Sequence, residues 1–165
     1  MKRRETVKPG NPEHAPLLSM SRLIYFAGSI RGGRDDVHLY QSLVQELRTY
    51  GTVLTEHVGD QGLSVQGEVS ETGDKEIHDR DLDWLQQSHV VVAEVTVPSM
   101  GVGYELGRAV VMDKPVLCLF RPDCGRRLSA MIRGAKGPRF TVMDYRPDQI
   151  KTILDQFFSQ TQIQT

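Results

Sequence analysis

The segment Val90–Thr96 limits the folds open to this chain more than any other feature. Five of its seven residues are apolar, and four of these are valine. A strand with one face in water alternates apolar and polar residues, whereas a strand of a parallel sheet is covered on both faces and is apolar throughout. The segment therefore predicts a buried strand in a parallel sheet, with helices packed on both faces.

The rest of the sequence alternates between strand-like and helix-like segments. Apolar runs predict four further strands, at Arg22–Gly28, Thr52–Glu56, Pro115–Phe120 and Arg139–Met143. Apolar residues at helical spacing predict helices at Asp35–Tyr50, Asp74–Gln87, Val102–Met112, Leu128–Arg133 and Pro147–Gln160. Because parallel strands need crossover connections, we expect an α/β fold: a doubly wound, five-stranded parallel sheet of the Rossmann-like or flavodoxin-like type, in a single domain.

The chain of 165 residues fits one such domain, which we place at residues 21–160. Residues 1–20 are rich in proline and charged side chains, so we expect a disordered N-terminal tail. The segment 59–73 contains four glycines and has no clear period. A loop of this length in a compact domain is typically functional or mobile.

Composition narrows the range of partners and cofactors. Lys and Arg number 20 against 21 Asp and Glu, so the basic excess typical of nucleic-acid-binding proteins is absent. The two cysteines do not form a disulfide framework, and we expect Cys118 to be a buried thiol. No spacing of Cys and His indicates a metal site. No apolar stretch has the length of a signal peptide or a membrane span, so we expect a soluble, intracellular protein without nucleic-acid or membrane partners.

Ligands of doubly wound sheets bind at the carboxyl ends of the strands, and the first strand ends in a glycine-rich turn. This turn consists of Gly28, Ser29, Ile30, Arg31, Gly32, Gly33 and Arg34. Backbone amides of such a turn, placed before a helix, can bind a phosphate. The pattern matches neither common phosphate-binding motif, and a tight turn that only needs glycine is the alternative.

The central strand runs into a second loop and helix start, which contains Ser99, Gly101 and Glu105. Glycine lets a ligand approach the backbone, and the serine hydroxyl lies near free amides. We expect Glu105 in the first helical turn, at the border of the buried stripe. It is either a functional carboxylate or a partner of the helix dipole.

The helix at Asp74–Gln87 carries Asp81 on the same face as Ile77, Trp84 and Leu85. An acid within an apolar stripe costs free energy unless it is paired. Asp81 is therefore a candidate proton donor, although a salt bridge at the edge of the stripe is equally consistent. Two carboxylates at one pocket are typical of glycoside hydrolysis, in which one attacks the sugar and the other protonates the leaving group.

Three further positions are weaker candidates. Tyr25 precedes the Gly28 turn and could reach a ligand or a carboxylate, and His57 ends the second strand. The arginine-rich stretch 121–139 contains Ser129. It is a solvated basic edge, a phosphate-attracting surface, or an interface that delivers Ser129 to a neighbouring site.

Several long motifs together resemble the 2′-deoxynucleoside 5′-monophosphate N-hydrolases of the nucleoside 2-deoxyribosyltransferase superfamily. The likeness covers roughly residues 22–158. Its motifs lie at 25–34, 54–57, 81–87, 90–105 and 128–134.

This resemblance implies a homodimer that hydrolyses the N-glycosidic bond of deoxynucleoside monophosphates without a cofactor, in cytoplasm and nucleus. Glu105 would be the nucleophile that forms a covalent deoxyribosyl intermediate, Asp81 would assist proton transfer to the base, and Tyr25 would position Glu105. The remaining implied substrate contacts are the glycine-rich turn with Ser29 and Arg31, then Ser99 and Gly101 at the phosphate, His57 beside the base, and Ser129, Ala130 and Met131 from the second subunit.

Two alternatives remain at this point. A nucleoside 2-deoxyribosyltransferase resembles the same arrangement of Tyr, Asp and Glu, but has an acid six residues before its nucleophile, where this chain has Ser99. A serine can bond a phosphate that an acid would repel, which favours a monophosphate substrate. The second alternative is a non-catalytic nucleotide-binding module on the same fold.

Overall fold

The computed structural model describes residues 21–30, 36–59 and 73–161. The expected tail at 1–20, residues 31–34 of the glycine-rich turn, and most of the loop at 59–73 lie outside the described residues.

A five-stranded parallel sheet forms the centre of the molecule, as the sequence predicts. Its strands are β1 (Leu23–Ala27), β2 (Thr52–Val53), β3 (Val90–Glu94), β4 (Val116–Phe120) and β5 (Phe140–Asp144). They follow the order β2-β1-β3-β4-β5, and every adjacent pair is parallel. This is the flavodoxin-like order, in which the chain changes direction between β1 and β3. Ligands of such sheets bind outside the carboxyl ends of these two strands.

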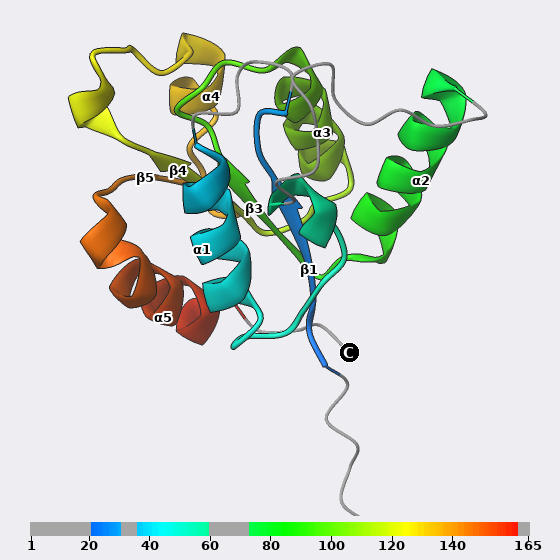
Figure 1. Cartoon of the computed structure of the whole chain (residues 1–165), viewed down its shortest axis with the longest axis horizontal. Helices are drawn as coiled ribbons and strands as arrows, with labels where there is room; N and C mark the ends of the chain where they lie inside the picture. The colour runs from blue at the N-terminus through cyan, green and yellow to red at the C-terminus, as the bar shows by residue number, and fades with distance from the viewer. Residues whose placement is uncertain (1–20, 31–35, 60–72, 162–165) are drawn as a thin grey trace, which may run out of the picture.

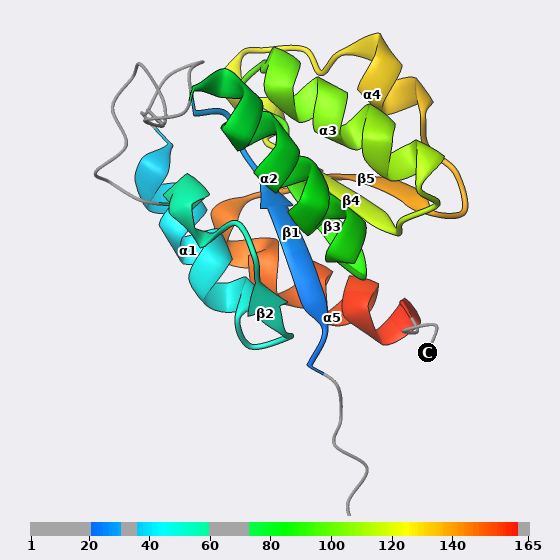
Figure 2. The ribbon, with the colours of Figure 1, turned by 90° about the vertical axis from the view of Figure 1, so that its right-hand side faces the viewer.

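Helices cover both faces of the sheet (Figure 1). The helices α1 (Val37–Leu47) and α5 (Ile150–Gln160) pack on one face. On the other face, α2 (Asp74–Gln87) and α3 (Met100–Val111) run alongside each other, next to the short α4 (Ala130–Gly134) (Figure 2). Single 3₁₀ turns occur at η1 (Glu56–Gly59), η2 (Pro122–Cys124) and η3 (Pro147–Gln149).

Two apolar cores result from the alternation of side chains along the strands. In β1, Ile24 and Phe26 face the core under α1 and α5, whereas Tyr25 and Ala27 face the core under α2 and α3. Every residue of β3 and β4 is buried, which confirms the expectation drawn from Val90–Thr96. Tyr25 therefore points to the α2–α3 side of the sheet.

The second strand is shorter than Thr52–Glu56, the predicted range. The buried Thr55 hydroxyl accepts the Phe26 N–H (2.8 Å) and donates to the Phe26 carbonyl (2.6 Å). This side chain takes over the backbone pairing, so the chain leaves the sheet after Val53 and turns into η1. As a result, His57 lies in a 3₁₀ turn and not at a strand end.

The first helix is also shorter than predicted and begins without a side-chain cap. Asp36 occupies the cap position, but its carboxylate forms an ion pair with Arg121. The helix ends at Leu47, and the turn that follows it requires glycine at position 51. A Cβ at Gly51 would lie 2.1 Å from the Arg22 carbonyl oxygen.

The third helix begins two residues earlier than predicted, at Met100, because the Ser99 hydroxyl accepts the Val102 N–H at 3.3 Å and caps it. Glu105 therefore lies in the second turn and not in the first. A partnership with the helix dipole, which acts within the first turn, loses its basis.

Both cysteines are free, and Cys118 is fully buried as predicted. None of the helices in the described ranges has the length and apolar character needed to cross a bilayer.

Candidate active site

A cavity of about 590 Å³ lies between α2, the start of α3 and the end of β1. Its position is the carboxyl edge of the sheet at the change of direction between β1 and β3, where ligands of this fold bind. It is lined by Gly28, Ile30, Asp74, Ile77, His78, Asp81, Leu82, Pro98, Ser99, Met100, Gly101, Val102, Tyr104 and Glu105.

Glu105 lines this cavity and is held by the buried Tyr25, which does not line it. The Tyr25 hydroxyl donates to Glu105 Oε1 at 2.8 Å, across 80 positions of sequence. Tyr25 is 1% exposed, and Glu105 is half-buried at the cavity wall. The bond holds one carboxylate oxygen of Glu105, so the orientation of the carboxylate relative to the cavity is fixed.

The surroundings of Glu105 oppose its ionisation. The pKa of Glu105 is raised to about 7, because burial raises it more than the Tyr25 hydrogen bond lowers it, and the charge of Asp81 adds to the rise. Burial and the two carboxylates also raise the pKa of Tyr25. A carboxylate with a pKa near neutrality and few solvent contacts is typical of catalytic groups.

Asp81 lines the same cavity from α2. Arg80 holds Asp81 Oδ1 with two donors, Nη2 at 2.8 Å and Nε at 3.1 Å. The salt bridge that the sequence left open as an alternative therefore exists, yet Asp81 also lines the cavity with Glu105. The ion pair and a place at the cavity wall thus occur together, and the role of Asp81 as a proton donor stays a prediction.

The first turn of α3 forms the next wall. Ser99 and Gly101 both line the cavity, and free amides at a helix start favour an anion. Gly101 is exposed, and a Cβ there would meet only the Ser99 hydroxyl, at 3.7 Å. Gly101 leaves the backbone accessible from the cavity.

The end of β1 contributes less than the sequence indicates. Gly28 and Ile30 line the cavity, but Ser29 is fully buried and is not among the lining residues. A Cβ at Gly28 would meet Tyr40 and Val58 at 3.2 Å, so packing also requires this glycine. Arg31, Gly32, Gly33 and Arg34 lie outside the described residues.

Besides the buried Tyr25 and Ser29, four further predicted site residues do not line this cavity. His57 contacts the Trp84 ring, with centroids 5.6 Å apart. Ser129, Ala130 and Met131 are exposed on and before α4. Within a single chain, the structure does not bring these three residues to the site, and their predicted role in a dimer stays a prediction.

Among the cavity residues that the sequence analysis did not single out, His78 and Tyr104 contact each other. His78 Nε2 and the Tyr104 hydroxyl are 3.1 Å apart, and this bond links α2 to α3 beside the cavity. The spacing from His78 to Asp81 and from Tyr104 to Ser99 carries no strong signal. Only the packing of α2 against α3 reveals them.

The site combines three chemical features. It has the carboxylates of Glu105 and Asp81, amides at a helix start that suit an anion, and apolar walls that include Ile30 and Ile77. In the described ranges, no three Cys, His, Asp or Glu side chains are grouped as metal ligands would be. The arrangement suits a ligand with an anionic end and a flat apolar end, and a reaction between them that uses two carboxylates.

Comparison with known proteins agrees with this chemistry. Residues 24–137 match the family model described as nucleoside 2-deoxyribosyltransferase. A Tetraodon nigroviridis protein named 5-hydroxymethyl-dUMP N-hydrolase is 64% identical over 137 residues, covering 82% of this chain and 96% of the relative. A Homo sapiens protein of the same name is 60% identical over 136 residues, covering 82% of this chain and 78% of the relative.

A solved structure has a similar fold. It is described as a Clostridium botulinum CMP N-glycosidase, BcmB, with a TM-score of 0.55 and 17% sequence identity. The match covers 82% of this chain and 99% of that chain. At this identity the likeness supports the fold alone.

Proposed function

Since the chain belongs to the nucleoside 2-deoxyribosyltransferase family, we propose that it is an N-glycosyl hydrolase of 2′-deoxynucleoside 5′-monophosphates. The products are a free nucleobase and 2-deoxyribose 5-phosphate. The observation that carries this proposal is the Tyr25–Glu105 hydrogen bond, with Asp81 lining the same cavity.

In the first step, Glu105 attacks C1′ of the deoxyribose as the C1′–N bond breaks. The bond electrons leave with the base, which takes a proton from Asp81. Cleavage passes through a cation-like sugar, which a carboxylate both stabilises and traps. In the second step, water attacks C1′ of the glycosyl ester, returns a proton to Asp81 and releases Glu105.

Tyr25, on strand β1, supports both steps. Its hydroxyl holds Oε1 of Glu105, which leaves the second oxygen for C1′. The same bond partly offsets the effect of burial and thus favours the ionised nucleophile. Tyr25 is therefore assigned to positioning and activating Glu105.

The α3 start is assigned to the 5′-phosphate. Ser99 supplies a hydroxyl and Gly101 gives access to the helix amides. The phosphate lies away from the reacting carbon, so its binding free energy can orient the sugar over Glu105. The glycine-rich turn with Ser29 and Arg31 is proposed to complete this subsite.

Ile30 and Ile77 supply apolar walls for a flat nucleobase. Two relatives carry the name 5-hydroxymethyl-dUMP N-hydrolase. We accordingly take 5-hydroxymethyl-dUMP as the first substrate to test, with His57 proposed beside the base.

We further propose a homodimer in which α3 and α4 face a second copy of the chain. Met100, Tyr104 and Val111 share one face of α3 and are 93%, 46% and 84% exposed, and Met131 on α4 is 82% exposed. Met100 and Tyr104 also line the cavity, so a subunit that covers this face would reach the site. This arrangement would deliver Ser129, Ala130 and Met131 to the partner's substrate.

Chromatography of reaction products tests the proposed activity. The substrates are 5-hydroxymethyl-dUMP, its free nucleoside and the matching ribonucleotide, each with and without an acceptor base. Free base from the deoxynucleotide alone is the expected result. Base release that requires an acceptor base would instead identify a transferase, and no release from this or other deoxynucleotides would leave a binding module.

A further inference from the structure

Arg80 is a cationic residue next to the proposed acid, and the mechanism above does not use it. Arg80 donates two hydrogen bonds to Asp81, from Nη2 at 2.8 Å and from Nε at 3.1 Å, and both reach the same oxygen, Oδ1. The Arg80 and Asp81 side chains are 29% and 21% exposed, so water screens this pair only in part. Neither of these bonds uses Asp81 Oδ2, and Asp81 lines the cavity.

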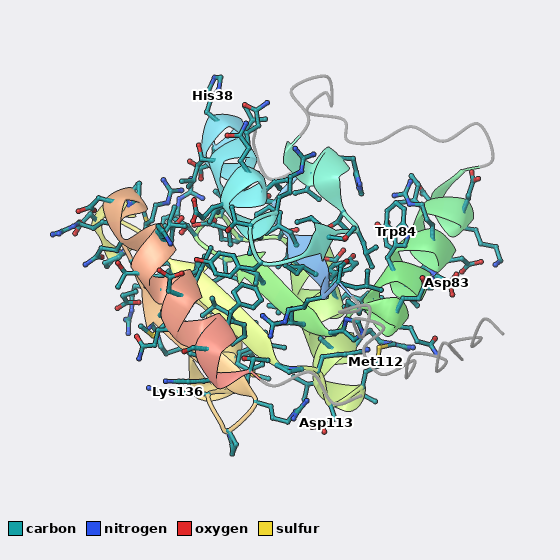
Figure 3. The ribbon with its side chains drawn as sticks, turned by 90° about the horizontal axis from the view of Figure 1, so that it is seen from below. His38, Asp83, Trp84, Met112, Asp113 and Lys136 are labelled. Atoms are coloured by element: carbon teal, nitrogen blue, oxygen red, sulfur yellow. The ribbon has the colours of Figure 1, made fainter. Side chains whose placement is uncertain are left out.

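The Arg80 guanidinium also contacts an aromatic ring. The Arg80 Cζ lies 4.6 Å from the centroid of the Trp84 ring, one helical turn further along α2. Trp84 in turn contacts the His57 ring of η1. Figure 3 shows Trp84 between α2 and the η1 turn, with Asp83 on the outer side of the helix. A planar guanidinium that lies over a ring and donates two hydrogen bonds has little freedom to rotate.

We propose that Arg80 is a positioning residue for Asp81, a role that rests on the function proposed above. Arg80 turns the Asp81 carboxyl so that Oδ2, which carries the proton, faces the leaving base. When that proton moves to the base, Asp81 becomes a carboxylate, and the guanidinium stabilises the new negative charge in a partly desolvated site.

If Arg80 has this role, the loss of activity that follows its substitution should depend on the leaving group. A nucleobase needs a proton to leave, whereas 4-nitrophenolate leaves as an anion. The probe is therefore 4-nitrophenyl 2-deoxyriboside 5-phosphate, compared with 5-hydroxymethyl-dUMP. A merely structural role of Arg80 would affect both substrates equally.

The test compares kcat/KM of the R80Q variant on both substrates. We expect a loss of about tenfold or more on the nucleotide, a part of the roughly 10²–10⁴-fold that general-acid catalysis contributes, and a change within about twofold on the nitrophenyl substrate. R80K keeps the charge but lacks the two-donor fork, and is expected to recover part of the loss. Equal losses on both substrates, or no loss on the nucleotide, would overturn the proposal.

Two controls separate this inference from its premise. K75Q removes a cation from the same helix at a side chain that is 85% exposed, and should leave both activities unchanged. D81N must show the same dependence on the leaving group. If D81N affects both substrates equally, the acid assignment of Asp81 fails. If D81N loses activity mainly on the nucleotide and R80Q affects both substrates equally, only the role of Arg80 fails.

Discussion

Glu105 has to be ionised to attack a sugar carbon, yet its surroundings favour the protonated form. Burial, with a smaller contribution from the charge of Asp81, raises the pKa of Glu105 to about 7. The Tyr25 hydroxyl acts in the opposite direction because it donates to the carboxylate. The balance at this residue sets the pH range in which the site can work.

The pH dependence of kcat/KM reports groups of the free enzyme. We expect kcat/KM to fall about tenfold per pH unit on the acid side of a limb near pH 7, because only ionised Glu105 reacts. Y25F removes the donor that favours ionisation, so its limb should move to higher pH and its kcat should fall. Steady-state rates between pH 5 and 9, an approximate range around that limb, would measure both effects.

The matched control is Y50F. Tyr50 donates to Asp155 at 2.6 Å on the exposed surface, so this variant also loses a tyrosine–carboxylate bond. Its pH limb should coincide with that of the wild type. If the Y25F limb stays in place or moves to lower pH, Tyr25 does not act on Glu105 as argued.

At the start of helix α3, Ser99 has two roles that one variant can separate. Ser99 caps the helix through the Val102 N–H, and it lines the cavity where the phosphate is proposed to bind. Asp is as good a cap as Ser. S99D should therefore change the free energy of unfolding by less than about 0.5 kcal/mol, while KM for a deoxynucleoside monophosphate rises at least about tenfold through charge repulsion.

S99A supplies the comparison, because it loses the cap but adds no charge. It should cost about 1 kcal/mol in the free energy of unfolding and raise KM less than S99D does. KM values for the free nucleoside and the monophosphate, with thermal unfolding, measure these effects. An equal rise of KM for both substrates in S99D would contradict the phosphate assignment.

Elements were predictable where local patterns decide them. The bounds of α2, Asp74–Gln87, follow from its apolar spacing and agree with the structure. The second strand was predicted too long because a tertiary bond from the Thr55 hydroxyl ends it. The first helix has no side-chain cap because Asp36, at the cap position, pairs with Arg121, 85 positions away. No local pattern contains these partners.

The site shows the same division. Periodicity placed Asp81 in an apolar stripe and Glu105 beside one, but the Tyr25–Glu105 bond depends on how β1 and α3 meet. The roles of these residues came from the resemblance to a family. His78 and Tyr104 had no signal in the sequence, because their contact exists only where α2 packs on α3.

For the whole molecule, the open question is whether one chain forms a complete site. The exposed apolar face of α3 and α4 led us to propose a homodimer in which each subunit contributes Ser129 to the site of the other. E105Q and S129A should each be nearly inactive alone. After unfolding and refolding of an equal mixture, the activity should recover to about a quarter of wild type, because each hybrid dimer contains one intact site.

Sedimentation measures the dimer in the same samples. M131D places a charge on the proposed interface and should shift the equilibrium towards monomer. A monomeric wild type, or no recovery of activity in verified hybrid dimers, would contradict the shared site. The assignments of Glu105 and Asp81 would be unaffected.

The central claim is that Glu105 carries the deoxyribosyl group during turnover, and mass spectrometry of a trapped intermediate tests it most directly. The substrate is a 2′-fluoro-arabino analogue of the deoxynucleotide, since fluorine at C2′ slows both steps by destabilising the sugar cation. The account predicts one added sugar phosphate per chain, located on Glu105 and absent from E105Q. An adduct on another residue, or E105Q turning over the natural substrate at the wild-type rate, would contradict it.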